Sequence, residues 1–265
     1  MLTSPVNISE GRDAALVGRI AAAAGDSLLD VHTDASHNRS VLTLGGTAVE
    51  DAAREVARLG VESIDVHLHT GVHPRVGAVD VVPFVPRPES SMEVAIAARD
   101  AFAEWIAREL SVPAFKYGPE RSLPEIRRGA FGTLRPDAGP QEPHPSAGAC
   151  CVGARPPLVA WNVLLAEGEN FAVARRIARE LRRDLAGVRA LAFDIAGSAQ
   201  VSCNLIDPAL TGPDRVYDFI ASRALVERCE LVGLIPDDVL RAVARDRWAL
   251  LDLSEDRTLE ARLGG

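Results

Sequence analysis

The residues best suited to chemistry lie in one short segment, residues 70–86, which reads TGVHPRVGAVDVVPFVP. His73 stands there directly before Pro74, and Arg75 follows two positions after the histidine. Imidazole is the side chain whose pKa starts closest to neutrality, so a positioned histidine can both take and give a proton. A proline restricts the residue before it to extended backbone, which helps to aim the ring of His73. The segment therefore indicates an acid–base site, although a surface histidine held in a turn would give the same pattern.

Two further histidines precede this segment and raise the alternative of a metal site. His67 and His69 alternate along a predicted strand, SIDVHLH, so both side chains would lie on one face. Together with His73 they could bind zinc, with nearby aspartates completing the shell. The sequence has no glutamate at the spacing of a metalloprotease motif. We therefore expect no metal and favour the acid–base interpretation.

Polar residues also gather near the amino terminus, where a strand is predicted to turn into a helix. Asn7, Ser9 and Glu10 lie at this turn, where backbone N–H groups and polar side chains converge. They are candidate substrate-binding residues. Helix capping by Ser9 or Glu10 is the alternative role.

Five further positions complete the candidate binding set. Four of them lie in the first half of the chain with His73, and the fifth lies in the second half. Asn38 and Arg39 end the polar loop ASHN, and Arg39 could pair bidentately with a carboxylate or lie on the surface as an ordinary arginine. Arg75 and Asp80 flank the histidine, where they could hold an anion and orient the ring. Asn204 lies on a predicted strand of the second half, where it either contacts substrate or satisfies a sheet edge.

The elements that must position these residues alternate between strand and helix throughout the chain. The hydrophobic period predicts strands at 2–8, 27–34, 39–46, 63–69, 78–86 and 113–118, and helices at 11–25, 48–60, 92–112 and 123–131. Residues 135–149 are too rich in proline and glycine for a regular element.

The pattern then starts again in the second half. It predicts strand, helix, strand, strand, helix, strand at 157–166, 170–185, 188–195, 199–206, 213–226 and 229–236. That order, β-α-β-β-α-β, is typical of the ferredoxin-like split β-α-β fold, and the first 86 residues fit it as well. We expect an α/β (α+β) protein of two such subdomains, 1–157 and 158–265, with a ligand crevice between them.

Composition limits the class of protein and of partner. The chain has 265 residues, a formal net charge of −8 and a pI near 5.3, which argues against nucleic acid or an anionic membrane as partner. No stretch has the pattern of a signal peptide or a membrane span, and the cysteines lack CxxC spacing. Adjacent Cys150 and Cys151 are expected to be small core residues. We expect a cytoplasmic protein.

Nearly the whole chain resembles the formiminotransferase domain of glutamate formimidoyltransferase, which in animals is fused to a cyclodeaminase. The resemblance rests on VNISEGRD, SHNRSV, GVHPRVGAVDVVPFVP, KYG, LPEIRRG, PDAGP, GARPPLVAWNVLL, AQVSCNLID and ELVGLIP. It implies a homodimer that transfers a formimino group from N-formimidoyl-L-glutamate to tetrahydrofolate, with His73 as catalytic acid–base and no metal. It also implies a folate-binding segment at 139–148, namely Gly139, Pro140, Gln141, Glu142, Pro143, His144, Pro145, Ser146, Ala147 and Gly148.

Five positions depart from the family pattern. Thr70 and Val72 stand where the family has a lysine and a glutamate, and Ala147 stands where it has a tryptophan. Glu142 and His144 also stand where the family has other residues. Two alternatives to formimino transfer therefore stay open: a related one-carbon folate enzyme with another donor such as 5-formyltetrahydrofolate, and a folate-binding module without catalysis. No glutamate stands beside His73 to favour its protonated form. The acid limb of the pH–rate profile is therefore expected at a lower pH than in typical members of the family.

Overall fold

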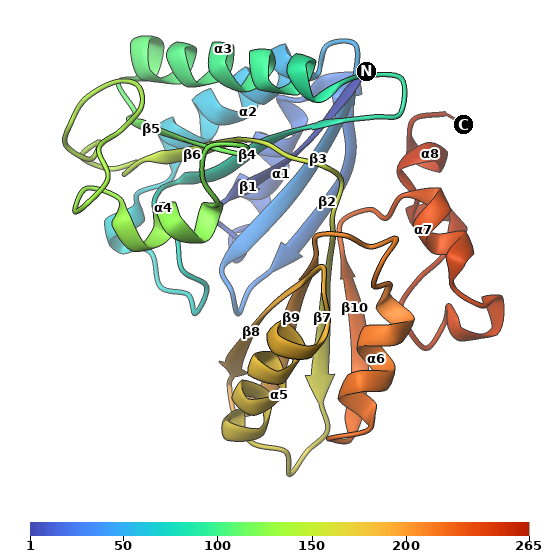
Figure 1. Ribbon diagram of the computed structural model, residues 1–265. Coiled ribbons are helices and arrows are strands. Elements are labelled where there is room, and N and C mark those ends of the chain that lie inside the picture. The colour runs from blue at the N-terminus through green and yellow to red at the C-terminus, as the bar shows by residue number, and fades with distance from the viewer. Residues whose placement is uncertain (265) are drawn as a thin grey trace. The chain divides into compact units, whose positions relative to one another are not determined.

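The computed structural model describes residues 1–264, and it divides into a first unit, Met1–Pro156, and a second unit that begins at Pro157 (Figure 1). Each unit has its own sheet and its own hydrophobic core. No helix within residues 1–264 is long and apolar enough to cross a membrane.

The first unit begins with the predicted β-α-β-β-α-β order. Its elements are β1 (Leu2–Ile8), α1 (Ala14–Ala22), β2 (Leu28–Asp34), β3 (Arg39–Gly46), α2 (Val49–Ser63) and β4 (Val79–Pro86). Strand β1 pairs antiparallel with both β3 and β4, and β2 pairs antiparallel with β3, which gives the order β2-β3-β1-β4 of a ferredoxin-like sheet. The predicted fold class is therefore confirmed for this unit.

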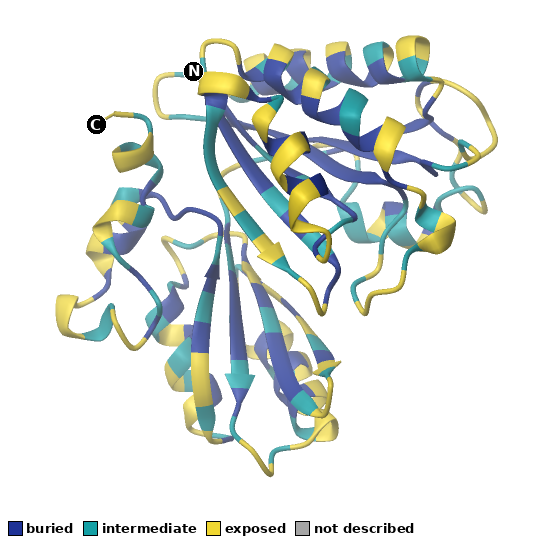
Figure 2. Ribbon diagram, turned by 180° about the vertical axis from the view of Figure 1, so that it is seen from behind, coloured by how far each residue is buried: buried dark blue, intermediate teal, exposed yellow. Residues whose placement is uncertain are grey.

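Two parallel strands extend this sheet beyond β4. After α3 (Met92–Leu110) come β5 (Ala114–Tyr117), α4 (Leu123–Gly129) and β6 (Cys150–Ala154), and β6 lies between β4 and β5. The apolar run of β4 is buried on both sides, because Val82 and Phe84 join the main core while Val81 packs with Phe115 and Ile126. Figure 2 shows these central strands as buried, with exposed residues along the outer helix faces.

The second unit repeats the order with an antiparallel sheet of four strands. Its elements are β7 (Val159–Leu165), α5 (Phe171–Asp184), β8 (Val188–Ile195), β9 (Ser198–Leu205), α6 (Pro213–Ala221) and β10 (Val226–Val232), in the sheet order β10-β7-β9-β8. Trp161 and Ile177 are fully buried in its core. The ferredoxin-like order is confirmed here too.

Three parts of the sequence prediction differ from the structure. Residues 63–69 are not a strand: Asp65 accepts a hydrogen bond from the His67 N–H (2.9 Å) and begins a short 3₁₀ helix, Val66–Leu68. Strand β6 was not predicted, because its five residues lack any alternation. The short helices α7 (Asp237–Ala242) and α8 (Leu259–Arg262) were not predicted either, whereas the irregular course of 135–149 is confirmed.

Candidate functional site

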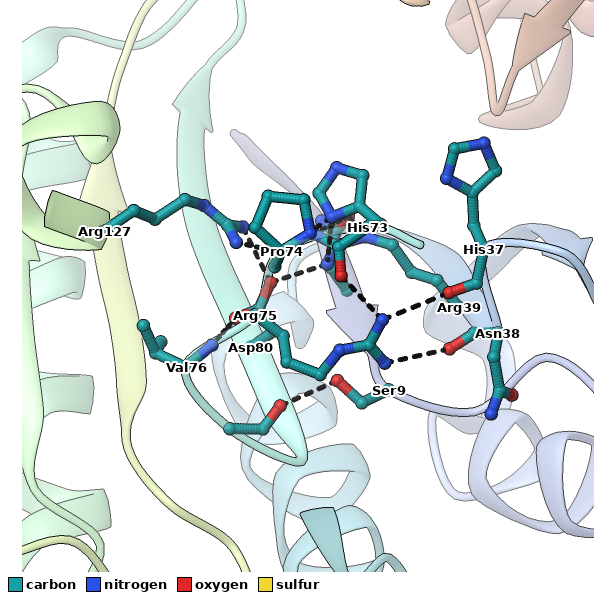
Figure 3. Close-up of polar contacts among 12 residues, drawn as sticks. Ser9, His37, Asn38, Arg39, His73, Pro74, Arg75, Val76, Asp80 and Arg127 are labelled. Atoms are coloured by element: carbon teal, nitrogen blue, oxygen red, sulfur yellow. Dashed lines mark hydrogen bonds and ion pairs between the residues drawn. The ribbon is translucent and has the colours of Figure 1, made fainter. Parts of the chain in front are cut away.

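A cluster of charged side chains and imidazoles surrounds His73 in the first unit (Figure 3). Its members come from the end of β1, the loop from β2 to β3, the segment between α2 and β4, the start of β4, and α4. Separate loops and strand ends thus supply the polar groups, while the sheet below them provides a rigid support.

Asp80 is the centre of this cluster. Its side chain is fully buried in β4, and its Oδ2 accepts hydrogen bonds from Arg39 Nη1 (2.6 Å) and Arg127 Nη2 (2.8 Å). Its Oδ1 accepts from the Val76 N–H (2.7 Å). Burial alone would raise the pKa of Asp80, but the two guanidinium groups and the backbone N–H lower it well below its usual range. The carboxylate is therefore ionised at any physiological pH and links β3 to α4.

Arg39 is held from two sides. Its Nε and Nη2 donate to Asn7 Oδ1 (3.0 and 2.8 Å), while its Nη1 binds Asp80. Burial lowers the pKa of Arg39, and Asp80 opposes that shift. Because each of these contacts is within the protein, Arg39 has a fixed position beside the imidazole of His73, with Nη1 3.4 Å from its Nδ1. The surface role that the sequence left open for Arg39 does not describe this residue.

The hydrogen bonds of His73 define how its ring can act. Nδ1 lies 2.8 Å from the Pro74 carbonyl, so Nδ1 carries the proton and donates it to that oxygen. Arg127 also donates to the Pro74 carbonyl and so fixes the same peptide group from α4. In this tautomer Nε2 holds the unprotonated lone pair.

The surroundings of His73 keep its ring neutral. Burial, followed by the positive charges of Arg39 and Arg127, lowers the pKa of His73 from 6.5 to about 2, against the smaller opposing effect of Asp80. A neutral imidazole can accept a proton, although a lower pKa also makes the ring a weaker base.

Arg75 connects its own segment, 64–78, with the loop from β2 to β3. Its Nη2 donates to the carbonyl oxygens of His73 (2.7 Å) and His37 (3.2 Å), and its Nη1 contacts the Asn38 carbonyl (3.4 Å) and the ring of His69. Burial lowers the pKa of Arg75 to about 10, so it stays charged near neutrality. Its contacts are mainly to backbone, which makes it a residue that fixes loop positions.

The candidates at the end of β1 have structural partners. Glu10 Oε1 accepts from the N–H groups of Gly11 (2.9 Å), Arg12 (2.7 Å) and Asp13 (2.9 Å), which precede α1. The helix is capped by Asp13, whose side chain accepts from the Leu16 N–H (2.9 Å), so the capping role that the sequence left open for Ser9 or Glu10 belongs to neither. Ser9 is buried, and its Oγ donates to the Gly77 carbonyl (2.7 Å) at the far side of the His73 segment.

Asn38 closes the loop between β2 and β3. Its Oδ1 accepts from the Gly11 N–H (2.9 Å) and its Nδ2 donates to the Thr70 carbonyl (3.2 Å), so it joins this loop to two others. Its φ of 47° lies in the left-handed region, which asparagine adopts more readily than most residues. The structure shows Asn38 as a loop anchor within the cluster, and its proposed contact with substrate stays a prediction.

The proposed folate segment, 139–148, lies beside the His73 segment. Gly77 and Gly148 form a β-bridge, and a Cβ on Gly77 would collide with the Ala149 carbonyl, so only glycine permits this approach. A second bridge pairs His144 with Gly148, and Ala147 is buried with its N–H donating to His144 Nδ1 (3.0 Å). Residues 139–143 are exposed. The segment is therefore a loop anchored at its second half.

The two histidines of the zinc alternative point to different partners. His67 Nε2 lies 2.7 Å from the Pro145 carbonyl and His69 Nε2 lies 2.7 Å from the Asn38 carbonyl. Within residues 1–264, no three His, Cys, Asp or Glu side chains are grouped so as to hold a metal ion. Cys150 and Cys151 are buried and unpaired with each other, as expected of core residues.

Asn204 belongs to the second unit. It is exposed on β9, opposite Ala160 of β7 and Arg189 of β8. It therefore lies within the sheet and not at its edge, and its contact with substrate stays a prediction.

Two members of the cluster were missed by the sequence reasoning. Arg127 lies in LPEIRRG, a motif that supported the family resemblance, so the motif itself was the available signal. His37 lies in SHNRSV, where only its neighbours Asn38 and Arg39 were selected. Its ring centroid lies 5.8 Å from that of His73. Such proximity follows from the contacts between the loop from β2 to β3 and the segment before β4, such as those of Arg75 with both histidine backbones, which local sequence does not reveal.

Comparisons with known proteins show which family this chain is similar to. The family described as "Formiminotransferase domain, N-terminal subdomain" matches residues 1–155. Over 269 residues the chain is 36% identical to a glutamate formimidoyltransferase of Streptococcus pyogenes, covering 90% of each chain. A glutamate formimidoyltransferase of Thermoplasma acidophilum is 34% identical, covering 97% of this chain and 95% of its own. The formimidoyltransferase-cyclodeaminase of Gallus gallus is 37% identical, covering 87% of this chain and 49% of its own.

Proposed function

Because this chain belongs to the formiminotransferase family, we propose that it transfers a formimino group from N-formimidoyl-L-glutamate to tetrahydrofolate, with His73 as general acid–base. The observation that carries this proposal is the HPR segment itself. It lies within the region of family similarity, and the structure gathers an aspartate, three arginines and a second histidine around it. Tetrahydrofolate is the co-substrate, and the mechanism uses no metal.

The reaction requires proton transfer between two amines. The N5 amine of tetrahydrofolate attacks the amidine carbon and must lose a proton, and the departing amine of glutamate must gain one. His73 is suited to the first of these steps, because its Nδ1–H is held by the Pro74 carbonyl and Nε2 then carries the lone pair. Its lowered pKa keeps that nitrogen unprotonated at neutral pH but also makes it a weaker base. The tautomer therefore supports the acceptor role more directly than the pKa does.

The arginines around His73 suit an anionic donor. The protein carries a net charge of −8, yet Arg39, Arg75 and Arg127 cluster here around the buried carboxylate of Asp80. We propose that this local positive potential attracts the carboxylates of the donor. Asn7, Ser9, Glu10, Asn38 and Asp80 then act mainly by holding the loops and the arginines in place. The exposed part of 139–148 is the proposed folate contact.

Replacement of His73 tests the proposal. His73→Ala should lower turnover by about 10²–10⁴-fold, the usual contribution of a positioned acid–base group, with little change in folate affinity. In the wild-type protein the acid limb of the pH–rate profile should lie below pH 6.5, because Arg39 and Arg127 lower the pKa of His73, and the variant should lack that limb. Steady-state kinetics with N-formimidoyl-L-glutamate and calorimetric titration with 5-formyltetrahydrofolate measure both quantities.

His32→Gln is a matched control, because His32 lies on β2 outside the cluster described here. It should leave turnover unchanged. Turnover of His73→Ala near that of wild type would contradict the acid–base role, and an equal loss of binding and turnover would make His73 a ligand contact instead. We also infer that the protein acts in the cytoplasm as a homodimer in one-carbon metabolism and histidine degradation, as the family resemblance implies.

A further inference from the structure

A second imidazole stands beside His73. The rings of His37 and His73 have centroids 5.8 Å apart and planes inclined at 60°, and both project to the same side of the loops, away from the Arg75 guanidinium (Figure 3). On the basis of the proposed function, we propose that His37 is a second catalytic residue, which protonates the departing amine while His73 takes the proton of the attacking amine.

The spacing of the two rings is built into the loops. A single nitrogen, Arg75 Nη2, donates to the carbonyl oxygens of both His37 (3.2 Å) and His73 (2.7 Å). One guanidinium group therefore connects the two histidine backbones, although they are distant in the sequence. Arg75 is a positioning residue in this arrangement.

Asp34 fixes His37 from the other side. Its Oδ1 accepts from the His37 N–H (2.9 Å) and from the Ser36 N–H (2.7 Å), which shapes the turn at the end of β2. Its Oδ2 lies 3.8 Å from His37 Nε2, and the His37 side chain is only 7% exposed. The charged and titratable groups that these contacts place beside His37 include Asp34, Arg75 and His73. The Asp34 carboxylate thus lies beside the ring of His37 and can orient it.

The distance between the rings fits the adduct of the reaction. In that adduct the attacking and departing nitrogens are bonded to one carbon and are about 2.5 Å apart, and each needs an imidazole nitrogen at about 3 Å. Two imidazoles that reach these nitrogens from the same side, the side to which both rings project, can do so with their centroids 5.8 Å apart. One ring alone would have to swing from one nitrogen to the other, whereas His73 is held through Nδ1 by the Pro74 carbonyl.

The proton balance is as follows. Tetrahydrofolate N5 forms a bond to the carbon of the donor amidinium, and the N5 proton passes to His73 Nε2. Imidazolium His37 then gives a proton to the nitrogen of glutamate, the bond between that nitrogen and the carbon breaks, and its electron pair leaves with glutamate. The products are 5-formimidoyltetrahydrofolate as an amidinium and the free amine of glutamate. A proton then returns from His73 to His37 through solvent.

Two substitutions at His37 separate a catalytic role from a structural one. Both His37→Ala and His37→Gln should lower kcat by about 10²-fold, the contribution of one proton-transfer group, while the KM for tetrahydrofolate changes less than about threefold. Added imidazole should restore part of the turnover of His37→Ala, because it can enter the space left by the ring, and should not affect His37→Gln. His32→Gln is the control, because His32 lies on β2, before the loop that carries His37.

The outcomes distinguish this inference from the proposed function. If the wild-type protein transfers the formimino group and either His37 variant retains turnover within about threefold, the second-histidine role is wrong while the function stands. Full activity in His37→Gln alone would assign His37 a packing role and overturn the inference as well. A wild-type protein that transfers nothing in the same assay would overturn both.

Discussion

The two units share one chain order and one sheet order but differ in how their second and third strands are joined. In the first unit, residues 35–38 connect β2 to β3 and include His37 and Asn38. In the second unit, Ala196 and Gly197 connect β8 to β9 directly. Equivalent places in the same fold therefore hold the candidate catalytic loop in one unit and a plain tight turn in the other.

The backbone geometry of these two turns sharpens the contrast. Asn38 has a φ of 47° and Ala196 a φ of 51°, so both turns need a residue in the left-handed region. The side chain of Asn38 uses that position to bind Gly11 and Thr70. Alanine has no polar group for such contacts, and it bears the strain without any compensating bond.

The connections before the last strand differ in the same way. Residues 64–78 join α2 to β4 and carry His73 and Arg75, whereas residues 222–225 suffice to join α6 to β10. A ferredoxin-like sheet thus forms with or without the longer loops. The comparison teaches that the sheet supplies stability and fixed loop ends, while the length and polar content of the loops supply the chemistry.

The largest expected effect concerns the buried carboxylate that organises the first unit. Asp80→Asn should lower the free energy of unfolding by about 3–5 kcal/mol, because Arg39 and Arg127 are then left as buried charges without their partner. Chemical denaturation of the purified protein measures this. In the second unit, Asp218 pairs with Arg247 (2.6 Å) but is 63% exposed, so Asp218→Asn should change stability by at most about 1 kcal/mol.

The pH dependence of the stability difference between wild type and Asp80→Asn provides a further check. The pKa of Asp80 is lower in the folded than in the unfolded protein, so its ionised form stabilises the fold above the unfolded value near 4. The stability gap between wild type and Asp80→Asn should be constant from pH 7 to pH 5 and shrink as the pH falls below about 4. Equal destabilisation by Asp80→Asn and Asp218→Asn would show that the two units do not differ as described.

The next effect in size concerns the charge next to the catalytic histidine. Arg127 lowers the pKa of His73, so Arg127→Gln should raise it and move the acid limb of kcat/KM upward by about one pH unit. A pH–rate profile measured at constant ionic strength detects the shift. Arg128→Gln is the matched control, because Arg128 is the next residue of α4 and is exposed. An unchanged limb in Arg127→Gln would assign Arg127 only to the support of Pro74.

The order of elements in both units and part of the candidate site could be predicted from the sequence, for identifiable reasons. Hydrophobic periodicity is local, so the β-α-β-β-α-β order of both halves was predictable from the residues alone. His73, with Arg75 and Asp80 after it, was predictable as a candidate site from the chemistry of these residues and from the family resemblance. The error at 63–69 has a local cause, because the carboxylate of Asp65 favours a helical turn over the strand that alternation suggests.

The arrangement within the site depends on contacts that the sequence does not contain. Arg127 meets Asp80 only because α4 lies beside the start of β4, and His37 meets His73 only because the loop from β2 to β3 lies against the segment before β4, where Arg75 contacts both backbones. Likewise, the capping role of Glu10 and the substrate role were equally compatible with NISEGRD, and the structure shows its carboxylate bound to three N–H groups before α1 while Asp13 caps the helix. Such long-range partners follow from tertiary packing.

The smallest expected effect lies in the second unit and tests the comparison from the opposite direction. Ala196→Asn places asparagine before Gly197, the sequence that best suits a two-residue hairpin turn with positive φ at both positions. Gly197 already has a φ of 91°, and its N–H donates to Asp194 Oδ1 (2.8 Å), so the turn needs no rearrangement to accept the new side chain. The substitution should raise the free energy of unfolding by about 0.5–1 kcal/mol, because asparagine adopts left-handed backbone at lower cost than alanine. Turnover should not change, since the turn lies outside the first unit.

Asn38→Ala, the reverse exchange at the equivalent turn, should lower both stability and turnover, because it removes the bonds to Gly11 and Thr70. If Ala196→Asn reduced turnover as Asn38→Ala does, the separation of chemistry from support between these two turns would be wrong.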